Sequence, residues 1–316
     1  HGVVVIAVGA EEWKPGEYLY GQDERVLTHL ELDEALAGND KRLSGVGRAV
    51  FIQCVGSREP ERPYCSKVCC THTMKSALAL KELNPNLEVY VLYRDIRTYG
   101  RREELYREAR KSGVVFIRYD PENKPLVEKR GTELIVTAQD HVLGRPIRVA
   151  ADLLVLASAV VPRDNAALAQ MFKLPLNEEG FFMEAHAKLR PVDFATDGFF
   201  LAGMAHYPKP MEESIAQAKA AASRASVVLS RKDLMVEGIV SHVDEVMCRG
   251  CGKCVTACPY NAVSLVAREG DRFVAHVQEA LCKGCGLCVS SCRSGALDIK
   301  GFSEEQTFCL IEAATG

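Results

Sequence analysis

The 316-residue sequence lacks an excess of charge of either sign and lacks any long hydrophobic run. Lysine and arginine contribute 39 positive side chains, and aspartate and glutamate contribute 42 negative ones. This balance argues against a nucleic acid partner, because nucleic-acid-binding domains carry clustered basic charge. No stretch of about 18 unbroken apolar residues occurs, so the sequence contains no candidate transmembrane helix.

The sequence also lacks a secretory signal, an initiator methionine and a hydrolytic constellation. It begins at His1 and passes at once into residues 3–8, an apolar segment that we expect to be a buried strand. A domain rarely begins in this way, so we expect that part of a larger polypeptide is absent or carried by another chain. Ser57 and Ser66 have no base arranged nearby in sequence, and we expect them to be loop residues.

Cysteine, in contrast, is abundant and clustered. Twelve of the 13 cysteines fall into three groups, and Cys309 stands alone on a predicted tail helix, where we expect buried packing. Clustered cysteines without a signal peptide indicate metal binding in a reducing cytoplasm rather than disulfides. We therefore expect a cytoplasmic metalloprotein.

The last third of the chain contains two cysteine runs with the spacing C-x2-C-x2-C-x3-C. In the bacterial ferredoxin pattern, three cysteines of a run bind one [4Fe–4S] cluster and the fourth binds the other cluster. Zinc needs no such triple run, and cysteines this close pair poorly as disulfides. We predict Cys248, Cys251, Cys254 and Cys292 as ligands of a first cluster, and Cys258, Cys282, Cys285 and Cys288 as ligands of a second.

Upstream, the hydrophobic pattern predicts a β-α-β unit with parallel strands. An apolar strand at 49–53 is followed by a cysteine-rich loop, a helix over 71–83 and a strand over 88–93. A polar connection occupies the residues from Gly9 to about Gly45. The remaining predicted elements are a helix at 102–112, a strand at 114–117, a β-meander over 124–150, strands at 152–157 and 198–203, and helices at 211–229 and 303–313.

The loop of this β-α-β unit lacks the G-x-G-x-x-G fingerprint with which such units bind dinucleotides. Its place is taken by Cys54, Cys65, Cys69 and Cys70, spaced C-x10-C-x3-C-C. Thiolates near a helix N-terminus are electrostatically favoured, so a third iron–sulfur cluster is one interpretation. A zinc site, a redox disulfide and buried structural cysteines remain alternatives. Lys75, one turn into the helix, is by itself an ordinary solvated lysine.

Taken together, three segments resemble a known family. They are residues 50–59 with 65–72, residues 198–205, and the double ferredoxin run. The chain resembles the HdrA subunit of heterodisulfide reductase and its relatives in HdrA-like electron-transfer complexes. The ferredoxin runs are generic, whereas the middle cysteine pattern on a Rossmann-like unit is specific to that family.

The resemblance implies an α/β fold with a thioredoxin-reductase-like flavoprotein core that carries FAD and a Rossmann-like insert. A 2[4Fe–4S] ferredoxin-like α+β domain follows this core. The implied divisions of the core are the end of the first FAD segment with its connection (1–45), the insert (46–150) and the returning FAD segment (151–232). The cysteine runs themselves place the ferredoxin domain at 238–300, and the tail helix follows (301–316).

The resemblance also implies roles for particular residues. Cys54, Cys65, Cys69 and Cys70 fall on the family's pattern for a third cluster. Gly9 and residues Gly203, Met204 and Ala205 would contact the flavin, and backbone N–H groups there favour an anionic reduced ring. Lys75 would then tune the flavin. The family's FAD fingerprint and N-terminal cluster domain are absent from this sequence, so we expect this chain alone to bind FAD weakly or to need a companion chain or the missing half.

The function implied is an electron-bifurcating subunit that passes electrons between FAD and ferredoxin-type clusters. The partners implied are HdrB-like and HdrC-like subunits, a hydrogenase-type or formate-dehydrogenase-type electron donor, and ferredoxin. One alternative is an NAD(P)H-dependent flavin oxidoreductase with a fused ferredoxin, which the missing glycine loop opposes. Another is a non-catalytic iron–sulfur scaffold without flavin.

Overall fold

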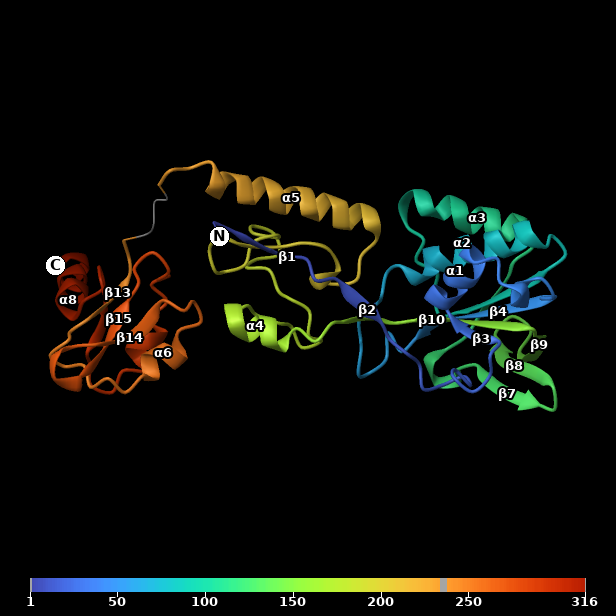
Figure 1. The fold of residues 1–316 in the computed structure, drawn as a ribbon, viewed down its shortest axis with the longest axis horizontal. Helices are drawn as coiled ribbons and strands as arrows, with labels where there is room; N and C mark the ends of the chain where they lie inside the picture. The colour runs from blue at the N-terminus through green and yellow to red at the C-terminus, as the bar shows by residue number, and fades with distance from the viewer. Residues whose placement is uncertain (1, 234–237, 316) are drawn as a thin grey trace. The chain divides into compact units, whose positions relative to one another are not determined.

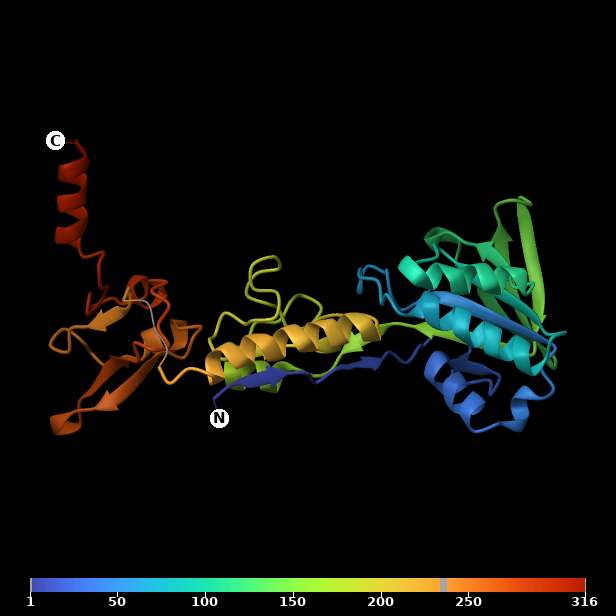
Figure 2. The ribbon, with the colours of Figure 1, turned by 90° about the horizontal axis from the view of Figure 1, so that it is seen from above.

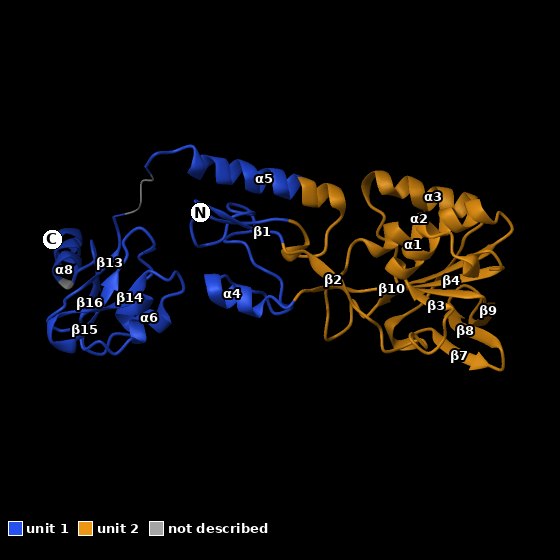
Figure 3. Cartoon of the chain, viewed as in Figure 1, with its two compact units in different colours: residues 1–7, 164–202, 216–316 blue, residues 8–163, 203–215 orange. Residues whose placement is uncertain are grey.

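The computed structural model of the chain describes residues 2–233 and 238–315. These residues form two compact units (Figure 3). The first, which we call the sheet unit, contains residues 8–163 and 203–215; the second contains residues 2–7, 164–202, 216–233 and 238–315. Among the described residues, no helix combines the length and the apolar character needed to cross a membrane.

The core of the sheet unit is a five-stranded parallel sheet with the strand order β3-β10-β4-β5-β6. Parallel sheets are covered on both faces, so their strands are apolar throughout rather than alternating. β4 shows this pattern, because every residue after Arg48 is buried. The strands are β3 (Val26–Thr28), β10 (Leu153–Ser158), β4 (Arg48–Val55), β5 (Glu88–Tyr93) and β6 (Val115–Arg118).

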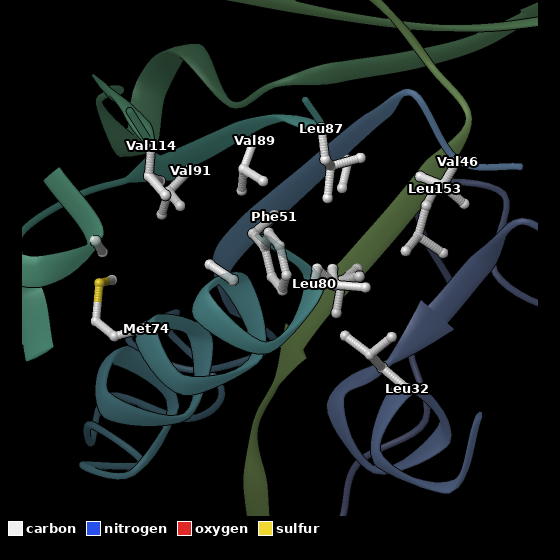
Figure 4. Close-up of a cluster of buried hydrophobic side chains, with 14 of the residues drawn as sticks. Leu32, Val46, Phe51, Met74, Leu80, Leu87, Val89, Val91, Val114 and Leu153 are labelled. Atoms are coloured by element: carbon white, nitrogen blue, oxygen red, sulfur yellow. The ribbon is translucent and has the colours of Figure 1, made fainter. Parts of the chain in front are cut away.

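The predicted β-α-β unit is confirmed, because β4 and β5 pair in parallel and α2 (Cys69–Leu83) follows β4. Three helices cover one face of the sheet: α1 (His29–Ala37), α2 and α3 (Glu103–Lys111). Figure 4 shows the side chains of this interface, among them Leu32, Phe51, Met74 and Val89. Burying one such aromatic or aliphatic side chain contributes about 1.5–3 kcal/mol.

An antiparallel meander covers the opposite face of the sheet (Figure 1). Leu134, Val136 and Val149 of the meander belong to the same buried cluster as Val50 and Ile52 of the sheet. The predicted meander is therefore confirmed as a third layer. Its strands are β7 (Leu126–Arg130), β8 (Glu133–Asp140) and β9 (Arg145–Ala151).

The predicted polar connection between Gly9 and Gly45 proves to be structured, which corrects the sequence interpretation. It contains β2 (Ala10–Glu12), β3 and α1. Thr28 and Glu31 form a capping box at the start of α1. That T-x-x-E signal is present in the sequence, and the helix that follows it buries Leu32 and Ala35. β3 and β10 also extend the Rossmann-like sheet beyond the 46–150 range.

Outside the sheet unit, β1 (Val4–Ile6) pairs in parallel with β12 (Phe199–Leu201). The prediction of a buried strand over 3–8 is only partly correct, because Ile6 is buried but Val5 is 45% exposed. The second unit also contains α4 (Ala166–Phe172) and the part of α5 (Met211–Leu229) from residue 216 onward. The short strand β11 (Val160–Pro162) belongs to the sheet unit and pairs there with β2.

The ferredoxin domain consists of two similar halves, each with a strand, a cysteine run, a short helix and a second strand. Figure 2 draws this part of the chain in orange and red. The first and last strands pair with each other, and so do the two middle strands. Its elements are β13 (Ser241–Val243), α6 (Lys253–Ala257), β14 (Val263–Ala267), β15 (Phe273–Val277), α7 (Leu287–Ser290) and β16 (Leu297–Ile299).

The predicted tail helix is α8 (Glu304–Thr315). Cys309 on this helix is exposed rather than buried, which corrects the expectation of a packing role. The apolar side chains of Phe308 and Leu310 are each 63% exposed. The hydrophobic residues of the tail therefore form no part of the domain's core.

Candidate iron–sulfur and flavin sites

The middle cysteines lie at the carboxyl-terminal edge of the parallel sheet. Cys54 is the last residue but one of β4, Cys69 and Cys70 are the first residues of α2, and Cys65 lies in the loop between them. In open α/β sheets, ligands bind at this edge. Cys54, Cys69 and Cys70 are buried, and Cys65 is partly exposed.

Burial alters the acid–base behaviour of these thiols, because a buried thiolate loses its hydration. Burial raises the pKa of Cys54, and it raises the pKa of Cys70 to about 11. The pKa of Cys69 is raised well above its usual value by burial and by the neighbouring thiols. Thiolates at this edge therefore require positive charge close by, which bound iron would supply.

The protein itself places positive and hydrogen-bonding groups against these sulfurs. Arg58 Nη1 lies 3.9 Å from Cys54 Sγ, and Asp95 Oδ1 holds the same nitrogen at 2.6 Å. The backbone N–H of Lys67 donates to Cys65 Sγ at 3.3 Å. Hydrogen bonds and charges at the sulfurs are how proteins stabilise and tune iron–sulfur clusters. The residues of this edge therefore fit such a group.

The loop that carries the middle cysteines is also strained. Cys54, Arg58 and Lys67 have φ values of 60°, 59° and 60°, in the left-handed region that non-glycine residues rarely adopt. Such strain persists only where the surrounding structure enforces it, and it concentrates at functional sites. Gly56 is required here for a different reason, because a Cβ atom would lie 2.2 Å from the ring of Trp13.

The ferredoxin domain uses glycine to turn the chain tightly around each cysteine run. Gly250 and Gly284 occupy the same place in the two runs, with φ values of 65° and 59°. A Cβ atom at Gly250 would lie 2.4 Å from the carbonyl oxygen of Phe273, and one at Gly284 would lie 2.6 Å from that of Ile239. Both positions therefore exclude any side chain.

Backbone N–H groups point at the sulfurs of this domain. Ser241 N donates to Cys282 Sγ, Ala275 N donates to Cys248 Sγ, and Ala262 N donates to Cys258 Sγ, each at 3.3 Å. Thiolates are better acceptors than thiols, so these donors fit cysteines that bind iron. Hydrogen bonds from nearby backbone groups and from the Ser294 hydroxyl lower the pKa of Cys292 even though burial opposes them.

Four cysteines converge on one small cavity of the domain. It is lined by Cys258 from the first run together with Cys282, Cys285 and Cys288 from the second. These are the four residues that the sequence assigns to the second cluster. In the described parts of the chain, no three His, Cys, Asp or Glu side chains are arranged around a single metal ion. A cubane cluster differs in this respect, because each thiolate binds a different iron.

The proposed flavin contacts lie beside the middle cysteines in the sheet unit. Met204 and Cys69 line the same cavity, which has a volume of ≈ 440 Å³. Small-molecule sites typically occupy about 300–1,000 Å³. Gly203–Ala205 form a 3₁₀ turn, and Gly9 precedes Ala10, another residue that lines the cavity. This space therefore suits part of a cofactor such as FAD.

Lys75 lines a neighbouring cavity of ≈ 490 Å³ together with Lys67 and Arg102. Its side chain is exposed, whereas Lys209, which lines the Met204 cavity, is only 3% exposed. Lys209 Nζ lies 3.3 Å from His206 Nδ1 and 3.9 Å from the centre of the Tyr207 ring. Lys209, and not Lys75, therefore shares a cavity with the proposed flavin contact Met204.

Sequence reasoning missed Lys209, His29 and Ser158, which all line the Met204 cavity. His29 is 4% exposed, and its Nε2 lies 2.9 Å from Thr73 Oγ1. Burial lowers the pKa of His29 well below its usual value, so the ring is neutral. His29 directly follows β3, and Ser158 is the last residue of β10. The end of a strand indicates a ligand site only once the order of the strands in the sheet is known.

Comparison with known proteins identifies the class of the carboxy-terminal domain. A family model described as a 4Fe–4S dicluster domain matches residues 241–299. This range contains all eight cysteines of the two runs. The chain is thus an iron–sulfur protein in which a parallel α/β sheet unit is combined with a dicluster domain, and the predicted fold class is confirmed.

Curated relatives then identify the family. The second HdrA-type iron–sulfur subunit of CoB–CoM heterodisulfide reductase from Methanopyrus kandleri is 43% identical over 287 residues, which cover 85% of this chain and 43% of that protein. The corresponding HdrA-type subunit of Methanocaldococcus jannaschii is 41% identical over 335 residues, covering 98% of this chain and 50% of that protein. The chain belongs to the HdrA family of heterodisulfide reductase subunits, and it spans about half the length of the curated relatives it matches.

Solved flavoproteins resemble the chain more distantly. Thioredoxin reductase of T. acidophilum aligns with 72% of this chain and 64% of its own, at 14% identity and a TM-score of 0.46. The flavoprotein disulfide reductase RclA of Escherichia coli aligns with 76% of this chain and 49% of its own, at 14% identity and a TM-score of 0.49.

Proposed function

We propose that this chain is an electron-transfer subunit of a heterodisulfide-reductase-type complex that uses FAD and [4Fe–4S] clusters. The observation that carries the proposal is that Met204 and Cys69 line one cavity. A predicted flavin contact and a predicted cluster ligand are thereby adjacent in the sheet unit. The dicluster domain supports the same function, because ferredoxin-type clusters carry electrons one at a time.

The residues around the cavity would bind and orient the flavin rather than react with it. When bound, FAD would supply two-electron chemistry and the clusters one-electron transfer. Backbone N–H groups at Gly203, Met204 and Ala205 would stabilise negative charge on the ring. Buried Lys209 would add a positive charge at the same cavity.

In the complex, we propose that the flavin is a bifurcation point and that the dicluster domain is the entry or exit route. Subunits of the HdrB and HdrC type, a hydrogenase-type or formate-dehydrogenase-type donor, and ferredoxin would be the partners, in the cytoplasm. Relatives support this, since one from Methanococcus maripaludis is named as the A-type subunit of an H2/formate:CoB–CoM heterodisulfide, ferredoxin reductase. Cys251 and Cys285, one in each run, are exposed, which brings both proposed clusters close to the surface.

Anaerobic quantification of iron, sulfide and flavin tests this proposal, on the purified chain with and without co-purifying subunits. Three cubane clusters require about 12 irons per chain, and two require about eight. We expect Cys69→Ala to lower the iron content from about 12 to about eight, because it removes a buried ligand of the third cluster. Cys309→Ala is the matched control, because that thiol is exposed on α8.

About eight irons in the parent chain would contradict the third cluster and leave the middle cysteines as a redox or structural site. Full iron with no flavin in either preparation would contradict the flavin assignment and favour a scaffold. Rapid bleaching of the flavin by NAD(P)H would favour the pyridine-nucleotide oxidoreductase instead.

The two lysines give a separate prediction for the flavin. Lys209→Met removes a buried charge beside Met204, so we expect the flavin potential to fall by about 30 mV or more, a tenfold change for a two-electron couple. Lys75→Met removes an exposed charge that solvent screens, so its shift should be smaller. Potentiometric titration followed by flavin absorbance measures both. Equal flavin potentials in the parent chain and in both variants would refute a tuning role for either lysine.

A further inference from the structure

The two halves of the dicluster domain can be compared position by position. Ser241 in β13 and Ala275 in β15 each stand seven residues before the first cysteine of a run, Cys248 and Cys282. Their backbones make the same contact across the domain. Ser241 N donates to Cys282 Sγ and Ala275 N donates to Cys248 Sγ, both at 3.3 Å. The two positions are therefore structurally equivalent.

Their side chains break this equivalence. Ser241 Oγ lies 3.4 Å from Cys288 Sγ and 3.0 Å from the carbonyl oxygen of Asp298, and Ser241 is 2% exposed. At the equivalent place, Ala275 has only a methyl group and is also 2% exposed. The proposed second cluster thus has a buried hydroxyl beside one of its ligands, and the first cluster has none at that position.

The state of Cys288 decides where the Ser241 hydrogen points. With Cys288 as a thiol, its S–H donates to Ser241 Oγ, and the serine hydroxyl donates to the Asp298 carbonyl oxygen. An iron-bound thiolate has no proton and can only accept. Because a charged acceptor forms the stronger hydrogen bond, the hydroxyl turns towards the sulfur.

The first cluster has a hydroxyl of its own, but in a different setting. Ser294 Oγ lies 3.6 Å from Cys292 Sγ at a partly exposed position. The residue equivalent to Ser294 in the other half, two positions after Cys258, is Tyr260. Water competes for the Ser294 contact, whereas the Ser241 contact is enclosed in a region of low dielectric, where a hydrogen bond has a larger electrostatic effect.

We infer that Ser241 raises the reduction potential of the second cluster and makes the two clusters of this domain electrochemically unequal. Reduction adds negative charge to the cluster and its thiolates. A hydrogen bond to Cys288 Sγ therefore becomes stronger on reduction and stabilises the reduced state. Electrons that enter the domain then favour the cluster bound by Cys258, Cys282, Cys285 and Cys288.

This inference rests on the proposed clusters, and a reciprocal pair of variants tests it in the full chain with its clusters. Ser241→Ala removes the hydroxyl, and Ala275→Ser introduces one at the equivalent position of the other half. An anaerobic redox titration followed by electron paramagnetic resonance resolves the reduction steps, and iron content is measured on the same samples.

We expect Ser241→Ala to move one reduction step to a more negative potential. The ratio of reduced to oxidised cluster at a fixed potential should fall about tenfold, which is about 59 mV for a one-electron couple. Ala275→Ser should move the other step to a more positive potential. Ser241→Thr, which keeps the hydroxyl, should titrate like the parent chain.

Full iron content with both steps unmoved in Ser241→Ala would overturn the role of Ser241 and leave the proposed function standing. A shift of the same reduction step in Ser241→Ala and in Ala275→Ser would also overturn the role of Ser241. The two hydroxyls would then not act on separate clusters. A parent chain that contains no ferredoxin-type clusters would overturn the proposed function itself, and this inference with it.

Discussion

Replacing Cys258 by alanine should abolish the second cluster and leave the first intact, although Cys258 belongs to the first run. The reason is that Cys258 lines one cavity with Cys282, Cys285 and Cys288. The variant should lose about four irons per chain, because a buried cubane missing one of its four thiolates is not retained. Cys292→Ala should do the reverse and remove the first cluster.

Alkylation under anaerobic native conditions, read by mass spectrometry, distinguishes this crossed arrangement from a sequential one. Iodoacetamide should label Cys282, Cys285 and Cys288 in the Cys258→Ala protein, because cysteines released from iron become reactive. In Cys292→Ala, the labelled residues should instead be Cys248, Cys251 and Cys254, the three remaining ligands of the first cluster. Cys309 is exposed and should be labelled in every sample, which makes it the internal control. Labelling of the first run in Cys258→Ala would refute the crossed assignment.

Gly250→Ala should be the most damaging glycine substitution in the dicluster domain. An alanine Cβ would lie 2.4 Å from the carbonyl oxygen of Phe273, and the residue would keep a φ of 65°. The left-handed conformation alone costs about 1–2 kcal/mol for a non-glycine residue, and the clash with rigid backbone adds to this. We expect a loss of more than about 3 kcal/mol together with loss of iron from the domain.

Gly270→Ala provides the matched control, because Gly270 has a similar φ of 72° but nothing within 4 Å of a Cβ atom. It should cost only about 1–2 kcal/mol for the backbone conformation and should retain iron. Thermal unfolding and iron content together measure the difference. If the two variants behaved alike, the tight turn at Gly250 would not be what shapes the first cysteine run.

The sulfur sites differ in how the protein compensates negative charge. In the ferredoxin domain, backbone N–H groups face the sulfurs, as Ser241 N faces Cys282 Sγ. At the sheet edge, an arginine side chain contributes as well, through Arg58 near Cys54. A guanidinium carries a full charge that is not lost at any accessible pH. The proposed third cluster is therefore expected to respond more strongly to a single side-chain substitution than the two ferredoxin-type clusters.

The sequence alone determined those features that depend on neighbouring residues. The cysteine spacing predicted an iron–sulfur domain at 238–300, and the family model independently places a dicluster domain at 241–299. Hydrophobic periodicity predicted α2, α5 and the strand at 88–93 to within two residues of their observed bounds. These signals are local, because the period of a helix or strand and the reach of a cysteine loop extend over only a few residues.

The tertiary structure alone decided which distant residues meet. It inserted β10 between β3 and β4, and it brought His29, Cys69 and Met204 to one cavity. It also showed that Ser241 and Ala275 are equivalent positions with different side chains. Strand order and cavity lining arise from long-range packing of two sheet faces, and a single sequence carries no periodic signal for packing partners so far apart along the chain.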